Sequence, residues 1–160
     1  SGTRTAPTVV LRGAWDARTT LQRDAAAEAD ARDALWDSGL RPLPAAALQI
    51  GGVQVQTAGT VCGNVCNASP AADGTPNLLV LDADVELSSR AGTRRIGVAE
   101  FVTGSRMTQR RPDELVTALV VRKPPADARS CFLKLGARAY LVISIVMVAG
   151  LVVPARDGTG

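Results

Sequence analysis

The stretch Thr60-Val-Cys-Gly-Asn-Val-Cys-Asn-Ala-Ser-Pro-Ala-Ala-Asp73 decides how the rest of this chain is interpreted. It follows Gly51, Gly52 and Gly59 and combines glycine with short polar side chains. Glycine lets the backbone approach a partner closely, and short polar side chains supply donors and acceptors. This composition predicts an ordered loop whose backbone N–H groups face a polar partner.

Helices precede this stretch and strands dominate after it. Alanine-rich and capped segments predict helices over residues 16–29, from 30 or 33 to 39, 44–50 and 76–81. β-Branched and alternating segments predict strands over residues 9–11, 83–88, 93–98, 114–121, 130–135 and 142–153. This order predicts an α+β fold with a mostly antiparallel sheet and flanking helices.

The composition excludes several kinds of function. The 160 residues suit one domain or two small lobes, and with 3% aromatic residues the core must consist mainly of Ala, Val, Leu and Ile. The chain has no histidine, which removes Ser-His-Asp and Cys-His catalysis and histidine-ligated zinc. It also removes the commonest general base, and no side chain is proposed as catalytic. The net charge of +3 comes from scattered residues, so we expect no nucleic-acid partner.

The cysteine content and the apolar segments indicate where in the cell the protein is located and whether it binds a metal. Cys62, Cys66 and Cys131 are too few for a four-cysteine zinc site and odd in number, so we expect no metal, reduced thiols and a cytoplasmic protein. Residues 140–153 are strongly apolar but shorter than the roughly 17–25 residues of a membrane-spanning helix, so we expect no membrane span. Residues 1–7 are small and polar, which is typical of a flexible leader.

The stretch 60–73 resembles the flavin-binding loop of the xanthine dehydrogenase and carbon monoxide dehydrogenase family of molybdenum hydroxylases. That loop runs Thr/Ser, Ile/Val, Gly-Gly-Asn, Ile/Leu, two variable residues, Ala-Ser-Pro, two more variable residues and Asp. The matching residues here are Thr60, Val61, Gly63, Asn64, Val65, Ala68, Ser69, Pro70 and Asp73. Residues 101–108 and 111–115 resemble further elements of the same domain, and residues 132–146 resemble the start of the family's C-terminal flavoprotein domain.

The resemblance implies a fold and a domain organisation. The fold would be the second lobe of the family's FAD-binding domain, the PCMH type. Residues 8–125 would form a partial FAD-binding domain, and residues 128–160 would begin the C-terminal domain. The chain would then be the second half of a flavin domain with the first strands of the next.

The resemblance also implies a function: an FAD-binding medium subunit that passes electrons from an iron–sulfur subunit to NAD or another acceptor. Its partners would be a molybdopterin-binding large subunit and a 2Fe-2S small subunit. Asp73 would accept a hydrogen bond from a ribose or ribityl hydroxyl, or cap the following helix. The implied FAD-binding residues are Ile50 near the adenine, Val116 near the isoalloxazine, and Thr60, Cys62, Gly63, Asn64, Ser69 and Asp73 along the loop.

The chain departs from the family pattern in ways that favour a second hypothesis. Cys62 replaces the first glycine of the Gly-Gly pair. If that position needs a positive φ or direct cofactor contact, a side chain there costs about 1 kcal/mol or more, so Cys62→Gly is expected to bind flavin more tightly. Nothing before Thr60 resembles the glycine-rich turn of the family's N-terminal lobe. The alternative is a truncated interaction module of the same ancestry with little or no flavin binding.

Overall fold

A computed structural model of the chain describes residues 8–12, 46, 49–139 and 142–154. The leader 1–7 and the helices predicted over 16–29 and onward to residue 39 lie outside the described residues. Within the helix predicted over 44–50, Ala46 is helical, whereas Gln49 and Ile50 form a turn and a bend.

Six of the eight described strands occur where the sequence predicts them, with ends shifted by a few residues. They are β1 (Thr8–Arg12), β2 (Asp84–Ser89), β3 (Gly92–Gly97), β4 (Val102–Gly104), β5 (Met107–Thr108), β6 (Leu115–Arg122), β7 (Arg129–Leu135) and β8 (Val146–Val152). The helices are α4 (Val53–Ala58), α5 (Val61–Asn67), α6 (Gly74–Val80) and α7 (Val98–Phe101). Helix α6 was predicted, whereas α4, α5, α7 and the small hairpin β4–β5 were not.

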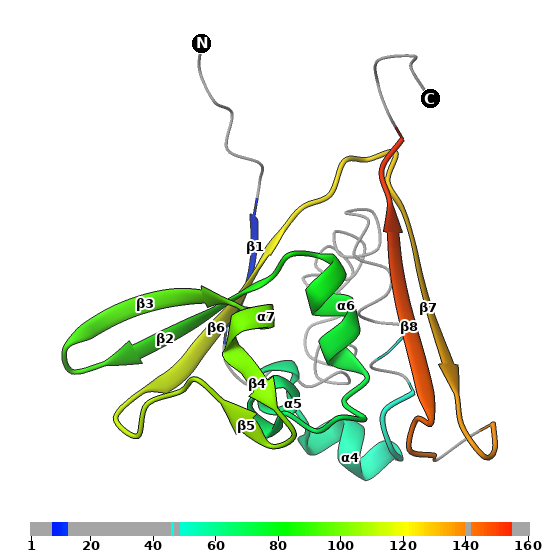
Figure 1. The fold of residues 1–160 in the computed structure, drawn as a ribbon, viewed down its shortest axis with the longest axis horizontal. Coiled ribbons are helices and arrows are strands. Elements are labelled where there is room, and N and C mark those ends of the chain that lie inside the picture. Colours follow the sequence, from blue (N-terminus) through cyan, green and yellow to red (C-terminus); the bar gives the residue numbers. More distant parts are fainter. Residues whose placement is uncertain (1–7, 13–45, 47–48, 140–141, 155–160) are drawn as a thin grey trace.

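The main sheet has the strand order β1-β6-β2-β3, and each neighbouring pair is antiparallel (Figure 1). Val85 of β2 lies opposite Leu119 of β6 and Ile96 of β3. The β2–β3 hairpin closes next to Gly92, whose φ of 134° favours glycine because side chains rarely adopt it. The predicted α+β class with a mostly antiparallel sheet is confirmed.

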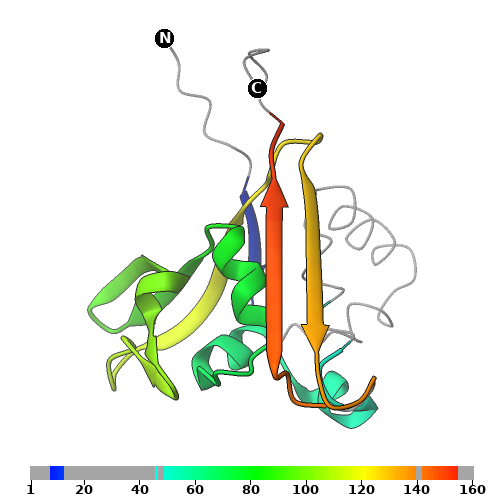
Figure 2. The same cartoon turned by 45° about the vertical axis from the view of Figure 1, so that its right-hand side comes forward.

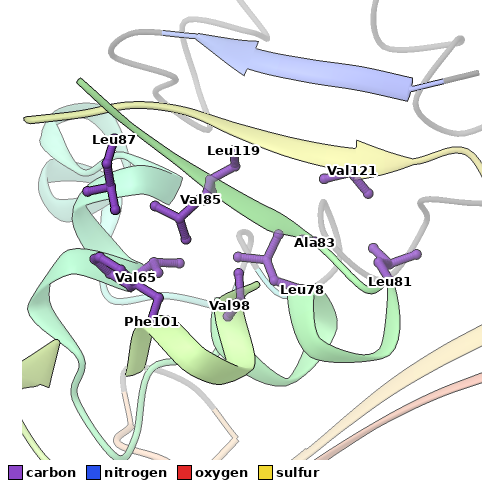
Figure 3. Close-up of a cluster of buried hydrophobic side chains, with 10 residues drawn as sticks. All are labelled: Val65, Leu78, Leu81, Ala83, Val85, Leu87, Val98, Phe101, Leu119 and Val121. Carbon is purple, nitrogen blue, oxygen red and sulfur yellow. The ribbon is translucent and has the colours of Figure 1, made fainter. Parts of the chain in front are cut away.

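The hydrophobic core lies between one face of this sheet and the helices α5, α6 and α7 (Figure 3). Alternation along β2 places Val85 and Leu87 on the covered face, as predicted. The core is built from Val, Leu and Ala with a single aromatic residue, in keeping with the composition. Its members are Val65, Leu78, Leu81, Ala83, Val85, Leu87, Val98, Phe101, Leu119 and Val121.

Strands β7 and β8 form a separate two-stranded antiparallel sheet, with Leu135 opposite Val146. Helix α6 lies between the main sheet and this hairpin, and it contacts β8 (Figures 1 and 2). The apolar segment at residues 142–153 is thus largely strand, because its β-branched residues suit extended backbone. None of the described helices is long and apolar enough to cross a membrane.

Candidate functional site

The first half of the glycine-rich stretch is a helix, so the loop predicted for it is wrong. Thr60 has extended backbone (φ −129°, ψ 153°), and its Oγ1 accepts a hydrogen bond of 2.8 Å from the backbone N–H of Gly63. The Thr60 carbonyl accepts from the N–H of Asn64 at 2.9 Å. A threonine N-cap of this kind stabilises a helix by about 1 kcal/mol. This cap outweighs the poor helix propensity of glycine, and α5 forms.

Two glycines allow close approaches within the protein itself. A Cβ at Gly63 would lie 2.8 Å from Thr60 Oγ1, so only glycine leaves room for the cap. A Cβ at Gly74 would lie 2.8 Å from Asn64 Oδ1, which accepts a 3.3 Å hydrogen bond from the Gly74 N–H. Glycine therefore serves the packing of α5 and α6 here, in addition to any contact with a ligand.

Cys62 lies in the first turn of α5, and its backbone is not strained. Among the described non-glycine residues, positive φ occurs at Ala68, Asp82 and Arg106. A side chain at position 62 was expected to cost about 1 kcal/mol or more if the backbone there had a positive φ. Because Cys62 does not have a positive φ, this cost does not arise. The Cys62 side chain is half-buried, and it reaches an open hollow beside the helix.

This hollow lies between the start of α5 and the start of β6, and its volume is about 560 Å³. Volumes of roughly 300–1,000 Å³ are typical of small-molecule and cofactor sites. The lining residues are Thr60, Cys62, Gly63, Cys66, Arg110, Leu115 and Val116. The structure thus brings together Thr60, Cys62, Gly63 and Val116, which the sequence proposed from positions more than 50 residues apart.

Arg110 supplies the positive charge of the hollow. Its NH1 donates to the carbonyls of Glu114 at 2.8 Å and of Arg111 at 3.2 Å. These bonds hold the guanidinium in place, and its remaining N–H groups can serve an anionic ligand. A fixed cation beside a threonine hydroxyl is a donor set suited to phosphate oxygens.

A buried carboxylate supports the segment that carries Arg110. The Glu114 side chain is 4% exposed, and its Oε1 and Oε2 accept from Arg94 Nε at 2.5 Å and NH2 at 2.9 Å. Oε2 also accepts from the Arg111 N–H at 2.8 Å. These hydrogen bonds, led by that of Arg94, lower the pKa of Glu114 to about 2. Glu114 is therefore ionised at neutral pH, and it fixes the turn between Arg110 and β6.

Asn64 Oδ1 and the Asp73 carboxylate accept hydrogen bonds from within the protein. Asn64 braces the start of α6 through Gly74, as above. Asp73 precedes α6, but its carboxylate does not cap the helix, so that alternative is wrong. Instead, Asp73 Oδ2 lies 2.7 Å from Lys134 Nζ, and Oδ1 accepts from the Ser144 hydroxyl. Helix α6 begins without a side-chain cap because the β7–β8 hairpin holds this carboxylate.

Ser69 and Ile50 lie outside the Thr60–Val116 hollow. Ser69 Oγ accepts from the Ala71 N–H at 3.3 Å, and the residue lines a second, mostly apolar hollow of about 350 Å³ that also touches Met147 of β8. Ile50 is half-buried at the bend before Gly51.

Sequence reasoning missed Cys66, Arg110 and Leu115 as lining residues. Cys66 was missed because a loop was predicted here, and only a helix places residues four apart on one face. For the Arg110–Arg111 pair, the sequence favours solvated surface charge over contact with a nucleotide phosphate, and no local pattern distinguishes Arg110 from Arg111. Leu115 is 71% exposed, and only the approach of α5 makes it part of a wall.

Fold and hollow together define a class: an antiparallel α+β lobe with a cofactor-sized hollow at the end of one strand. A family model described as "FAD binding domain in molybdopterin dehydrogenase" matches residues 16–125. The chain belongs to this family, which confirms the resemblance noted in the sequence and makes FAD the cofactor of its family.

Named relatives agree with this membership. The chain is 37% identical to the nicotinate dehydrogenase FAD-subunit of Eubacterium barkeri over 112 residues, covering 68% of this chain and 38% of that protein. It is 29% identical to the carbon monoxide dehydrogenase medium chain of Afipia carboxidovorans over 117 residues, covering 69% and 41%. The chain thus spans less than half the length of these relatives.

Solved structures show the same fold. A reconstituted CO dehydrogenase from Oligotropha carboxidovorans superposes with a TM-score of 0.70 at 25% identity, covering 78% of this chain and 43% of that one. Quinoline 2-oxidoreductase from Pseudomonas putida 86 gives a TM-score of 0.73 at 19% identity, covering 92% and 47%. The similarity to quinoline 2-oxidoreductase, at 19% identity, concerns the fold alone.

Proposed function

We propose that this chain is the FAD-binding lobe of a molybdopterin-dependent dehydrogenase. In this role it serves electron transfer between an iron–sulfur subunit and an external acceptor such as NAD. When bound, FAD supplies the redox chemistry at its isoalloxazine, and the protein supplies position and electrostatics. The proposal requires no catalytic acid or base from this chain.

The observation that carries the proposal is the composition of the hollow. Arg110 and the Thr60 hydroxyl suit phosphate and hydroxyl groups, because a hydroxyl that accepts one hydrogen bond can still donate its hydrogen. Gly63 presents backbone where a Cβ would clash. Leu115 and Val116 form an apolar wall suited to an aromatic ring. These residues and Cys62 are proposed to contact FAD.

The other residues implied by the resemblance are proposed to act indirectly. Asn64 and Asp73 would hold α5 and α6 in position through their internal hydrogen bonds. Ser69 would stabilise the turn between these helices. Ile50 does not line the hollow, so it would contact only a part of FAD that extends outside the hollow.

Domain organisation and partners belong to the same proposal. We propose a partial FAD-binding domain over 8–125 and the beginning of the family's C-terminal domain over 128–160. The separate β7–β8 sheet and the end of the family match at residue 125 support this division.

We further propose a molybdopterin-binding large subunit and a 2Fe-2S small subunit as partners. In support, the outward face of β7–β8 exposes Leu133, Leu135, Val146 and Val148 by 52–68%, and such apolar faces mark interaction surfaces. The three free thiols support a cytoplasmic location.

A truncated module that keeps the fold but binds little flavin is the second candidate. The specific observation in its favour is that Asn64 Oδ1 and the Asp73 carboxylate are occupied by the protein. The hollow then offers few polar side chains to FAD.

Titration of the purified chain with FAD separates the two candidates. If the chain is an FAD-binding lobe, quenching of flavin fluorescence and a shifted visible spectrum of the flavin are expected. If neither changes, the FAD proposal fails and the truncated module stands.

A matched pair of variants tests the role of Arg110. Arg110→Met keeps the aliphatic stem and removes the charge, so it is expected to weaken FAD binding by about tenfold or more. Arg111→Met is the control, because Arg111 does not line the hollow and its backbone N–H is retained. Equal losses in both variants contradict a specific role for Arg110.

A further inference from the structure

Cys62 and Cys66 form a pair of thiols on one wall of the hollow, one helical turn apart on α5. Side chains four residues apart in a helix have Cβ atoms about 5–6 Å apart. Burial raises the pKa of the Cys62 thiol, and the nearby Cys66 thiol raises it further. Independently of these shifts, both residues line the same hollow.

A disulfide does not suit this pair. The bond needs Cβ atoms about 3.5–4.5 Å apart, which is closer than an intact helix allows at this spacing. Both thiols are free in the structure. The FAD proposal assigns no role to Cys66 and only a wall contact to Cys62. The chemistry left to two adjacent thiols is joint ligation of a soft cation.

We propose that Cys62 and Cys66 form a two-thiolate site for a soft monovalent cation of the Cu(I) type. Thiolate is the ligand that Cu(I) selects. Zinc needs four ligands, and the described residues contain no group of three or more His, Cys, Asp or Glu side chains. Two ligands match the low coordination number that a monovalent soft cation accepts.

Charge balance places Arg110 in the same site. Two thiols release two protons and bind one monovalent cation, so the complex carries one net negative charge. Burial raises the pKa of the Cys66 thiol, and Arg110, which lines the hollow, offsets part of this rise. Its guanidinium compensates the charge of the complex. Because protons are released, affinity for the cation rises with pH.

The site shares its space with the proposed cofactor. A cation held by both sulfurs occupies the wall of the Thr60–Val116 hollow, so cation and FAD are expected to compete. This competition rests on the proposed function, whereas ligation by the two cysteines does not.

Titration of the full 160-residue chain with Cu(I) tests the site. Cu(I) is supplied anaerobically as its acetonitrile complex, and free Cu(I) is measured with the coloured chelator bicinchoninate. One Cu(I) per chain is expected for the unmodified protein and for the control Cys131→Ser, whose thiol is exposed on β7.

Cys62→Ser and Cys66→Ser are each expected to weaken Cu(I) binding by at least roughly 100-fold. Loss of a supporting partner already costs roughly 10–100-fold, and each variant removes a ligand. Wild-type affinity in either folded variant, or loss of binding in Cys131→Ser, overturns the proposal. Circular dichroism identifies the folded variants, and either cysteine variant alone is decisive. Cu(I) binding by a chain that does not bind FAD leaves this site intact and removes the FAD proposal.

Discussion

Lys134 Nζ lies 2.7 Å from Asp73 Oδ2, and this ion pair joins the β7–β8 hairpin to the start of α6. The two side chains are only 6% and 5% exposed. Lys134 also donates to the carbonyl of Gln49 at 3.2 Å. The pair therefore fastens three segments around the end of the glycine-rich stretch, and it positions α6 between the two sheets.

Asp73→Asn is expected to destabilise the protein strongly, because it leaves the Lys134 charge buried without its counter-charge. Removal of one partner from a buried pair costs about 3–5 kcal/mol. The double variant Asp73→Asn, Lys134→Met is expected to recover part of that loss. The measurement is the free energy of unfolding in urea.

The exposed pair Arg122–Asp82 is the control for this prediction. Its side chains are 61% and 79% exposed, and NH1 lies 3.1 Å from Oδ2. Asp82→Asn is expected to change the unfolding free energy by about 0–1 kcal/mol. Equal effects of Asp73→Asn and Asp82→Asn contradict a buried, interdependent pair.

Glu114 predicts a loss of stability in acid. Hydrogen bonds from Arg94 and from the Arg111 N–H lower its pKa to about 2 from the ordinary 4.5. A carboxyl whose pKa is lower in the folded state stabilises the fold fully above its unfolded pKa. That stabilisation is lost as pH falls from 4.5 toward 2.

Urea midpoints between pH 6 and pH 2 measure this effect. Glu114→Gln is expected to remove part of the pH dependence, with the difference from wild type largest at neutral pH and shrinking toward pH 2. Glu100→Gln, at an exposed position in α7, is the control and keeps the wild-type slope. Identical pH slopes in wild type and Glu114→Gln contradict the assignment.

Local patterns in the sequence carried enough information to predict the strands of the main sheet and the β7–β8 hairpin. Alternation places Val85 and Leu87 on one face, and β-branched runs mark β6 and β8. A side-chain period of two depends on neighbours in sequence, so it is visible without the fold. The antiparallel class followed from the order of these segments.

Helix α5 was not predictable by composition, because glycine and asparagine favour turns. The deciding interaction is the cap of Thr60 on Gly63, a single hydrogen bond that composition does not register. The role of Asp73 depends on Lys134, which lies 61 residues away, and Arg110 reaches the hollow only once β6 has paired with β2. The positions of Asp73 and Arg110 thus depend on contacts between segments that are distant in the sequence.

Thr60→Val is expected to lose the cap of α5 and with it about 1 kcal/mol of unfolding free energy. It also removes a hydroxyl from the hollow, so FAD binding is expected to weaken by about threefold to tenfold. Thr60→Ser retains the hydroxyl and is expected to keep both properties near wild type. Urea unfolding and flavin fluorescence measure the two effects, and a serine variant as impaired as the valine variant contradicts them.

Cys62 allows backbone and side-chain effects to be separated. Because its backbone is helical, Cys62→Gly is expected to be less stable than Cys62→Ala, by up to about 1 kcal/mol from helix propensity. Both variants remove the sulfur atom from the hollow, and relief of about 1 kcal/mol of crowding tightens FAD binding about fivefold. Cys131→Ala, on β7, is the control and leaves FAD affinity unchanged. Unchanged or weaker FAD binding in both Cys62 variants shows that this thiol does not obstruct the cofactor.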